Sequence, residues 1–280
     1  VATARALSDV AEIVLARVLR IAERDLVAAH GRLDGRSNAG LAIVAYGSLG
    51  GAELGFGSDL DLVFLYDSDS VQGESDGVRP LDGQRWYARL AQRVVHLLGT
   101  LTRAGRLYEV DVRLRPDGSK GMLVLGLGAY ESYLRERAWT WELQALVRAR
   151  AVAGDVGLAR RFAQLRDDLL ALPRDAAIVR GEVVAMRARW RAERDRSDAQ
   201  RFDLKQGEGG LVDVEFLLQA LVLAGANGHA SLRNSGNSAE LIALLARCDA
   251  LDAGDAQSLA QAHAELLDRA IRCTLDGSAP

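Results

Sequence analysis

The sequence predicts an α+β protein in which a small α/β domain with a short mixed sheet is followed by an all-helical domain. Short apolar runs with the length of strands occur only in the first 116 residues. After about residue 128 the apolar residues recur at helical spacing, and no further strong strand is expected there. A chain of 280 residues is also long enough for about two domains.

The first predicted element is a long helix over residues 3–30, where apolar residues recur near helical spacing with arginines between them. Three glycines between residues 31 and 40 break the pattern. We therefore expect residues 1–34 to form an N-terminal helix that packs on the α/β domain. That domain is expected to span residues 35–125, and a helical bundle to span 126–280.

Three strands are expected in the α/β domain, at residues 41–46, 59–66 and 106–115. The first two are apolar runs of suitable length, and the third alternates strictly between apolar and charged side chains from Tyr108 to Arg115. A glycine-rich turn (47–58), a polar loop (68–79) and a helix (82–103) lie between them. Further helices are expected at 129–152, 155–171, 175–197, 211–225, 237–249 and 255–275.

Composition and charge exclude several classes of function. The net charge of −3 provides no global basic field for nucleic acid. The arginine-rich segment 187–201 resembles an RNA-binding arm, but its acidic residues at helical spacing favour a solvated helix face. No apolar run reaches about 18 residues, and no signal peptide is recognisable. We therefore expect no nucleic acid and no membrane among the partners.

Cysteine and histidine usage indicates a reducing compartment. Cys248 and Cys273 lie far apart in helical-looking sequence, which is neither a disulfide framework nor a zinc pattern. The four histidines show no ligand spacing. We expect a cytoplasmic protein. Because the chain starts at Val1 instead of Met, we also expect it to be a piece of a longer protein.

Two carboxylates mark the start of the second predicted strand. Asp59 and Asp61 are two residues apart, so in a strand they point to the same face. Two carboxylates this close repel each other unless a cation lies between them, and hard oxygen ligands suit Mg²⁺. Taken alone, the pair is more often simply the solvated start of a strand.

The turn before this strand has features of a phosphate site. Gly47 permits a close backbone approach or a positive φ angle. The segment after Ser48 is able to start a short helix whose free N–H groups would bind phosphate. The turn matches neither a P-loop nor a dinucleotide fingerprint. A hairpin-like turn that merely uses helpful glycines is the alternative.

The third predicted strand carries a row of charges on one face, formed by Glu109, Asp111, Arg113 and Arg115. In isolation this row favours an edge strand with solvated charges. If this strand lies beside the second strand, the row indicates a binding site instead, because Asp111 would complete the metal site and Arg113 would reach phosphate.

These pieces together resemble a known superfamily. Gly-Ser, ten residues, Asp-x-Asp on a strand and a later Asp on a strand are similar to the polymerase-beta-like nucleotidyltransferases. The amino-acid sequence resembles one of their families, the glutamine synthetase adenylyltransferases, and the matching segments occur in the same order from about residue 1 to 275. Four segments carry this resemblance: 44–67, 108–123, 139–155 and 202–223. Many members of that family have Lys where this chain has Ser48.

The family is bifunctional: one unit removes AMP from glutamine synthetase, and a homologous unit attaches it. The segment WTWELQALVRAR (139–150) resembles the C-terminal, attaching unit. The resemblance therefore implies a nucleotidyltransferase that moves AMP from ATP to a tyrosine hydroxyl of glutamine synthetase, releases pyrophosphate and lowers glutamine synthetase activity in nitrogen regulation. It also implies a PII-type signal protein and glutamine as regulators.

The resemblance implies roles for individual residues as well. Asp59, Asp61 and Asp111 are the implied catalytic residues and the ligands of two Mg²⁺ ions. The implied nucleotide-binding residues are Gly47, Ser48, Arg113 and Lys205.

Lys205 also stands out in the composition. Lysine and arginine total 35, yet only Lys120 and Lys205 are lysine. Lysine is a compact point charge that arginine does not replace. We expect Lys205, in the loop DLKQGEGG, to reach the triphosphate or to pair with Asp213 or Glu215. A chance surface lysine is the alternative, and Lys120, in a turn, is expected to be an exposed loop residue.

Two other functions stay open at this stage. The removing unit of the same family performs phosphorolysis of the tyrosine–AMP bond and needs the same acids. A non-catalytic regulatory or docking module is the other alternative, and the three aspartates argue against it.

Overall fold

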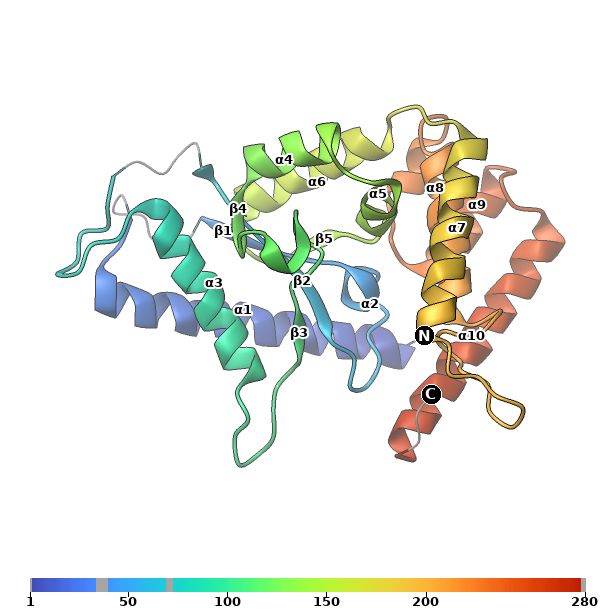
Figure 1. The fold of residues 1–280 in the computed structure, drawn as a ribbon, viewed down its shortest axis with the longest axis horizontal. Helices are drawn as coiled ribbons and strands as arrows, with labels where there is room; N and C mark the ends of the chain where they lie inside the picture. The colour runs from blue at the N-terminus through green and yellow to red at the C-terminus, as the bar shows by residue number, and fades with distance from the viewer. Residues whose placement is uncertain (1, 34–39, 69–72, 278–280) are drawn as a thin grey trace.

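The computed structural model describes residues 2–33, 40–68 and 73–277, and it confirms an α+β fold (Figure 1). A small open sheet lies between helices in the larger part of the molecule, and helices α7–α10 stand together beside it. The elements, in order, are α1 (Ala2–His30), β1 (Leu41–Ala45), α2 (Gly47–Gly50), β2 (Leu60–Tyr66), α3 (Gly83–Gly99), β3 (Val110–Asp111), η2 (Gly118–Lys120), β4 (Val124–Gly126), α4 (Leu127–Glu136), α5 (Thr140–Leu146), β5 (Arg150–Gly154), α6 (Val156–Leu170), α7 (Ala176–Arg194), α8 (Leu211–Gly225), η3 (Ala230–Arg233), α9 (Ser238–Arg247) and α10 (Ala253–Leu275).

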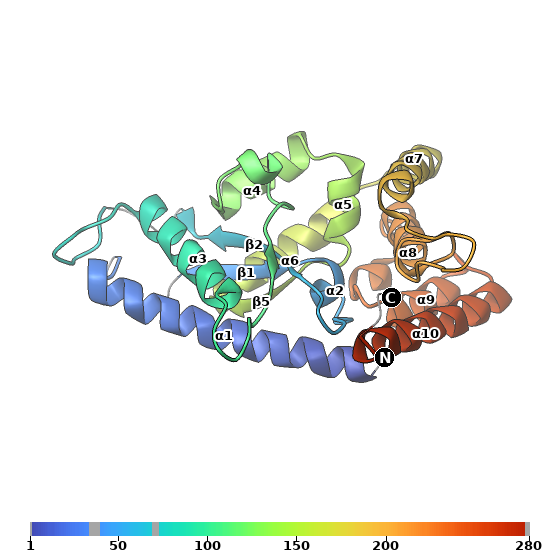
Figure 2. The same cartoon turned by 60° about the horizontal axis from the view of Figure 1, so that its bottom comes forward.

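The sheet has the order β3-β2-β1-β5. β1 is antiparallel to both of its neighbours, while β3 and β4 pair in parallel with the two ends of β2. Both faces of β1 are buried, which explains why its sequence is continuously apolar. Helices α1 and α3 cover one face, and α4 and α6 cover the other (Figures 1 and 2).

The fourth strand of this order, β5, was not predicted. The expected helix over 129–152 is wrong, because α4 ends at Glu136, α5 ends at Leu146 and β5 begins at Arg150. The expectation of no strand after residue 128 is wrong for the same reason. An unpaired β1 would leave a row of N–H and C=O groups open at the sheet edge, and β5 pairs with them. The predicted domain boundary at residue 125 stays a prediction.

The third predicted strand, 106–115, is much shorter than expected. Only Val110 and Asp111 pair with β2. The carboxylate of Asp111 accepts a hydrogen bond from the backbone N–H of Arg113 at 2.8 Å, and this local bond replaces sheet pairing. The guanidinium of Arg115 donates to the carbonyl oxygens of Gly121 and Ser119 at 3.1 and 3.2 Å, which closes the loop that follows.

The other predicted helices agree with the structure to within several residues at their ends. Helices α7–α10 share one hydrophobic core, centred on α8 residues such as Leu218, Val222 and Leu223. The predicted boundary at residues 34 and 35, and residues 69–72 of the polar loop, lie outside the described residues. Within the described ranges, no helix combines the length and the apolar character that crossing a membrane requires.

Candidate functional site

Two of the three predicted carboxylates are neighbours across the sheet. Asp61 on β2 and Asp111 on β3 are partners in the parallel register, and Asp59 is exposed just before β2. Burial, followed by the negative charge of Asp111, raises the pKa of Asp61 to about 6, whereas the charge of Lys205 acts against this rise. The structure therefore gathers negative charge at the point where β2 and β3 meet.

Arg113 lies against this cluster. Its Nε is 3.0 and 2.9 Å from the two carboxylate oxygens of Asp111. The side-chain hydrogen bond from Arg113 lowers the pKa of Asp111, so this carboxyl is ionised at neutral pH. The side chain of Arg113 is 70% exposed, and its release from Asp111 into solvent therefore requires little repacking.

Mg²⁺ is the metal expected at Asp59, Asp61 and Asp111. Across residues 2–33, 40–68 and 73–277, no three His, Cys, Asp or Glu side chains stand ready to hold a metal ion. The donor set nevertheless fits, because Asp59, Asp61 and Asp111 supply hard carboxylate oxygens whose mutual repulsion a cation would relieve. Asp111 becomes available once Arg113 leaves it.

The predicted turn packs directly on Asp61. Gly47 has a φ of +52°, and a Cβ at this position would lie 2.3 Å from Oδ2 of Asp61. Only glycine satisfies both the left-handed backbone and this close approach. The helix predicted to begin after Ser48 is α2, and it begins two residues earlier, at Gly47.

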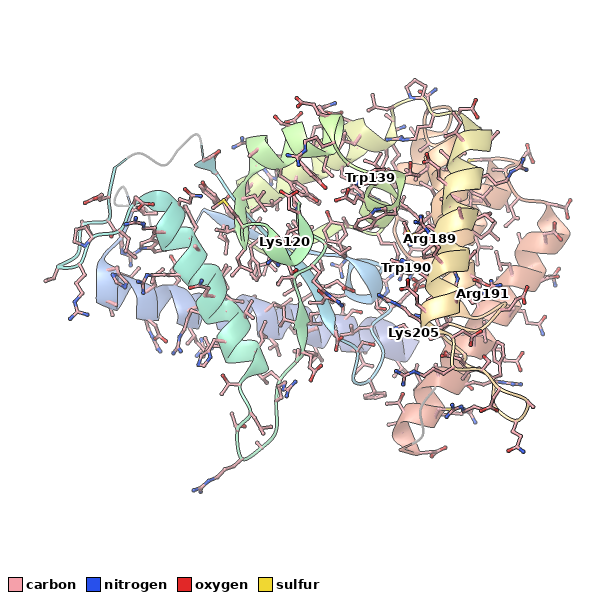
Figure 3. All side chains as sticks on the ribbon, in the orientation of Figure 1. Lys120, Trp139, Arg189, Trp190, Arg191 and Lys205 are labelled. Atoms are coloured by element: carbon pink, nitrogen blue, oxygen red, sulfur yellow. The ribbon has the colours of Figure 1, made fainter. Side chains whose placement is uncertain are left out.

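Lys205 approaches the site from the opposite side of a cleft of about 380 Å³. Ser48 and Asp59 line the cleft on the α/β side, and Lys205 and Glu215 line it on the helical side. Figure 3 shows Lys205 near the lower end of α7, beside α2. An apolar part of the same cleft is formed by Phe56, Leu211, Leu267 and Ile271.

The other predicted partners of Lys205 are held by arginines. Asp213 accepts hydrogen bonds from Arg187 and, at 2.7 Å, from Arg191. Glu215 forms an ion pair with Arg148 at 2.8 Å. The phosphate role of Lys205 therefore stays a prediction, supported by its place in the cleft. Lys120 is exposed on η2, as expected.

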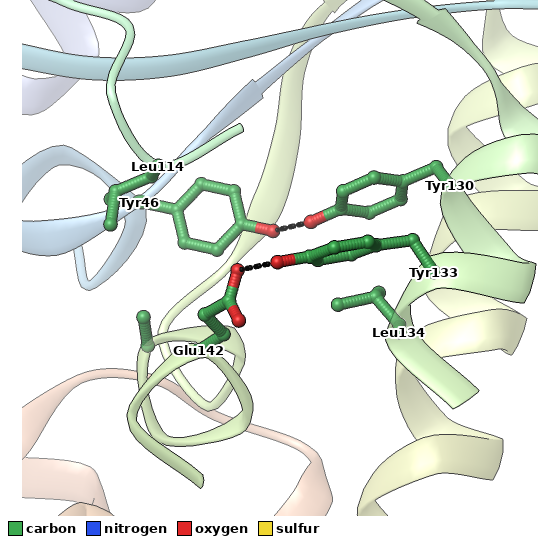
Figure 4. Close-up of a pocket in the computed structure, with 7 residues that line it drawn as sticks. Tyr46, Leu114, Tyr130, Tyr133, Leu134 and Glu142 are labelled. Atoms are coloured by element: carbon green, nitrogen blue, oxygen red, sulfur yellow. Dashed lines mark hydrogen bonds between the residues drawn. The ribbon is translucent and has the colours of Figure 1, made fainter. Parts of the chain in front are cut away.

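A buried group of tyrosines supports the turn from behind (Figure 4). Tyr46, immediately before Gly47, shares a hydrogen bond with the hydroxyl of Tyr130 on α4. The hydroxyl of Tyr133 donates to Glu142 at 2.7 Å. Burial raises the pKa of Tyr46 and of Tyr130, so both phenols stay neutral and serve as fixed hydrogen-bonding supports.

Sequence reasoning missed two buried charged residues: Glu53, which lines the cleft, and Arg148, which pairs with it. A signal was present in the segment LVRARAVA (146–153), where two arginines alternate with apolar residues. That alternation is typical of a strand with both arginines on one face. The helical interpretation of 129–152 concealed it.

Two family models match different parts of this chain. Residues 2–165 match the family model described as glutamate-ammonia ligase adenylyltransferase, and residues 184–276 match the model described as PII-uridylyltransferase. The helical part of the chain therefore also resembles enzymes outside the first family.

Curated relatives carry the name bifunctional glutamine synthetase adenylyltransferase/adenylyl-removing enzyme. The relative from Stenotrophomonas maltophilia (strain R551-3) is 56% identical over 272 residues, which is 97% of this chain and 29% of the relative. The relative from Xanthomonas axonopodis pv. citri (strain 306) is 57% identical over 276 residues, which is 99% of this chain and 29% of the relative. The chain thus spans less than a third of the length of these relatives. Because the first of the two family models covers more than half of the chain, the chain belongs to the glutamate-ammonia ligase adenylyltransferase family.

Proposed function

We propose that this chain catalyses the Mg²⁺-dependent transfer of AMP from ATP to a tyrosine hydroxyl of glutamine synthetase, with release of pyrophosphate. One observation carries the proposal: Asp61 lies beside Asp111 and under the turn at Gly47, and the charge of Lys205, which lines the adjacent cleft, acts on it. The names of the relatives support the protein substrate. A PII-type protein, glutamine and a cytoplasmic location stay predictions.

The proposed reaction is an in-line displacement at phosphorus. The tyrosine oxygen forms a bond to the α-phosphorus of ATP, the bond from that phosphorus to the bridging oxygen breaks, and pyrophosphate leaves with the electron pair. The tyrosine proton must also leave, and a free tyrosine has a pKa of about 10. Asp111 is ionised at neutral pH and lies at the site, so its carboxylate would accept that proton once Arg113, whose hydrogen bond lowers the pKa of this carboxyl, has left it; the alternative is that bound Mg²⁺ would lower the pKa of the tyrosine.

The remaining groups bind and orient. Bound Mg²⁺ would supply Lewis-acid stabilisation of the charge on the phosphates. Ser48 and Lys205 line the cleft from opposite sides, so a triphosphate between them would meet a hydroxyl and a cation. Arg113, once released from Asp111, offers a guanidinium fork for a phosphate.

The test is transfer of label from α-³²P-ATP to unmodified glutamine synthetase in the presence of Mg²⁺. We expect transfer by the wild-type chain and a loss of at least about a thousandfold in the Asp59→Asn/Asp61→Asn double variant, the range seen when preorganised charge is removed. Asp111→Asn should also abolish turnover but spare much of the ATP binding. Transfer by the double variant at near wild-type rates would refute the roles of these aspartates.

A second incubation separates the two activities of the family. Adenylylated glutamine synthetase is supplied with phosphate and no ATP, and ADP release is measured. Release of ADP at rates above the forward transfer would assign the chain to the removing reaction. A chain that neither transfers AMP nor binds Mg²⁺-ATP would instead be a regulatory module.

A further inference from the structure

A buried arginine joins the two sides of the cleft. Arg148 lies between α5 and β5, and its side chain is only 2% exposed. Its Nη2 lies 2.6 Å from Oε2 of Glu53, which follows α2, and its Nη1 lies 2.8 Å from Oε1 of Glu215 on α8. One guanidinium therefore bridges the segment that follows β1 (47–54, called the turn segment below) and helices α7–α10 (called the helical bundle).

Glu53 has further partners in the helical bundle. The backbone N–H and the hydroxyl of Ser238, at the start of α9, donate to its carboxylate at 2.9 and 2.8 Å. Next to it, the amide of Asn237 donates to the carbonyl oxygen of Gly51 at 3.1 Å. His263 on α10 lies 3.9 Å from Glu53, and burial lowers the pKa of this histidine, so it is uncharged at neutral pH.

Burial makes these contacts expensive to break. The side chain of Glu53 is 5% exposed, and a buried charge that loses its partner destabilises a protein strongly. Separating the turn segment from the start of α9 would therefore leave the buried carboxylate of Glu53 without its bonds to Ser238.

Three glycines leave room for Arg148. A Cβ on Gly51 would lie 2.2 Å from Nη2 of Arg148, and a Cβ on Gly50 would lie 2.3 Å from its carbonyl oxygen. A Cβ on Gly236, just before α9, would lie 2.8 Å from its Cα. Backbone from both sides of the cleft thus closes directly around this one residue.

Arg150 provides an internal comparison. It lies two residues further on, and it donates to the carbonyl oxygens of Leu49 and Gly50, both at 2.9 Å. Its ion-pair partner is Glu12 of α1, at 2.5 Å, and not a residue of the helical bundle. Arg148 and Arg150 therefore hold the same turn against two different parts of the molecule.

We propose that Arg148 is a positioning residue that locks the turn carrying Ser48 to the helical bundle carrying Lys205. Ser48 belongs to α2, and Lys205 precedes α8, whose Glu215 binds Arg148. With Arg148 in place, both residues line one cleft of fixed width. The consequence for ATP rests on the proposed function, whereas the coupling of the two parts does not.

Hydrogen–deuterium exchange of the full chain tests the coupling. In Arg148→Lys, whose ammonium cannot bridge two carboxylates as a guanidinium does, we expect amides in 48–54 and in 236–241 to exchange at least about fivefold faster. In the matched variant Arg150→Lys, only 48–54 should exchange faster. Unchanged exchange at 236–241 in Arg148→Lys, or an equal increase in Arg150→Lys, would overturn the coupling.

The apparent KM for ATP tests the positioning role. We expect Arg148→Lys to raise the KM at least about tenfold with kcat within about threefold, because uniform binding of ATP is lost. Arg150→Lys should raise it by less than threefold. Gly51→Ala keeps every charge but displaces the guanidinium, and it should reproduce the change.

An unchanged KM in both Arg148→Lys and Gly51→Ala would overturn the positioning role. If the wild-type chain transfers no AMP, the proposed function fails on its own. In that case the dissociation constant of Mg²⁺-ATP, measured by calorimetry, replaces the KM, and the exchange comparison still decides the coupling.

Discussion

Replacing Asp61 by asparagine should abolish AMP transfer and at the same time make the protein more stable. Burial and the charge of Asp111 raise the pKa of Asp61 from 3.8 to about 6. In the unfolded chain the carboxyl ionises at its ordinary pKa. Between these two values the folded state binds more protons than the unfolded state, so the free energy of unfolding falls as the pH rises through this window.

The size of this effect follows from the two pKa values. At 1.36 kcal/mol for each pH unit, a carboxyl that holds its proton up to pH 6 instead of 3.8 costs about 3 kcal/mol of stability above pH 6. Asparagine has nearly the same shape and no charge. The Asp61→Asn variant should therefore be up to about 3 kcal/mol more stable than wild type at pH 8, and about equally stable at pH 4.

Urea unfolding in EDTA, followed by tryptophan fluorescence at pH 4, 6 and 8, measures this difference. EDTA matters because a bound divalent cation would favour the ionised carboxylate of the wild type. Asp59→Asn is the matched control, since Asp59 is exposed and its charge is only a minor cause of the raised pKa of Asp61, so its replacement should give a much smaller pH-dependent gain. An Asp61→Asn variant that is less stable than wild type at pH 8, or whose advantage is the same at pH 4, would refute the reasoning.

Three further outcomes are expected. Gly47→Ala should lower AMP transfer at least about a hundredfold, since its Cβ would meet a carboxylate oxygen at 2.3 Å, whereas Gly57→Ala, also at positive φ but with open space around it, should only lose about 1 kcal/mol of stability. Lys205→Met should raise the apparent KM for ATP about tenfold, and Lys120→Met, at a residue that does not line the cleft, should leave the kinetics unchanged. Tyr133→Phe should lower the free energy of unfolding by about 1 kcal/mol in urea titrations with no change in kcat, because only one partly buried hydrogen bond is lost.

Local patterns were sufficient to predict most of the fold. The run LAIVA forms β1, and the run beginning at Leu60 forms β2, because an apolar segment of this length is stable only between two covered faces. The patterns failed where a short-range polar contact competed with the sheet. Asp111 bonds the backbone of Arg113, and that bond ended a strand which alternation alone extended to residue 115.

The candidate site, too, was predictable from local patterns only in part. The proximity of Asp61 and Asp111 follows from strand periodicity once two strands are assumed to pair, and it was predicted. The contact of Arg148 with Glu53 joins residues 95 positions apart, and no local pattern reports it. The glycines that close around Arg148 were visible in the sequence, but their partner was not, because a glycine signals close approach without naming what approaches.

The raised pKa of Asp61 and the Arg148 bridge belong to one energetic arrangement. A partly buried carboxylate beside other carboxylates favours hydration of the site, and an opening of the cleft would let that water in. The bridge acts against that opening, because the buried charge of Glu53 keeps its partner only while the cleft stays closed. Asp61 can therefore be held partly desolvated, in a state that gains from binding a cation, without the helical bundle separating from the turn. A site built from repelling charges needs such attracting charges nearby, and Arg148 supplies them by pairing with Glu53 and Glu215, which line the cleft on its two sides.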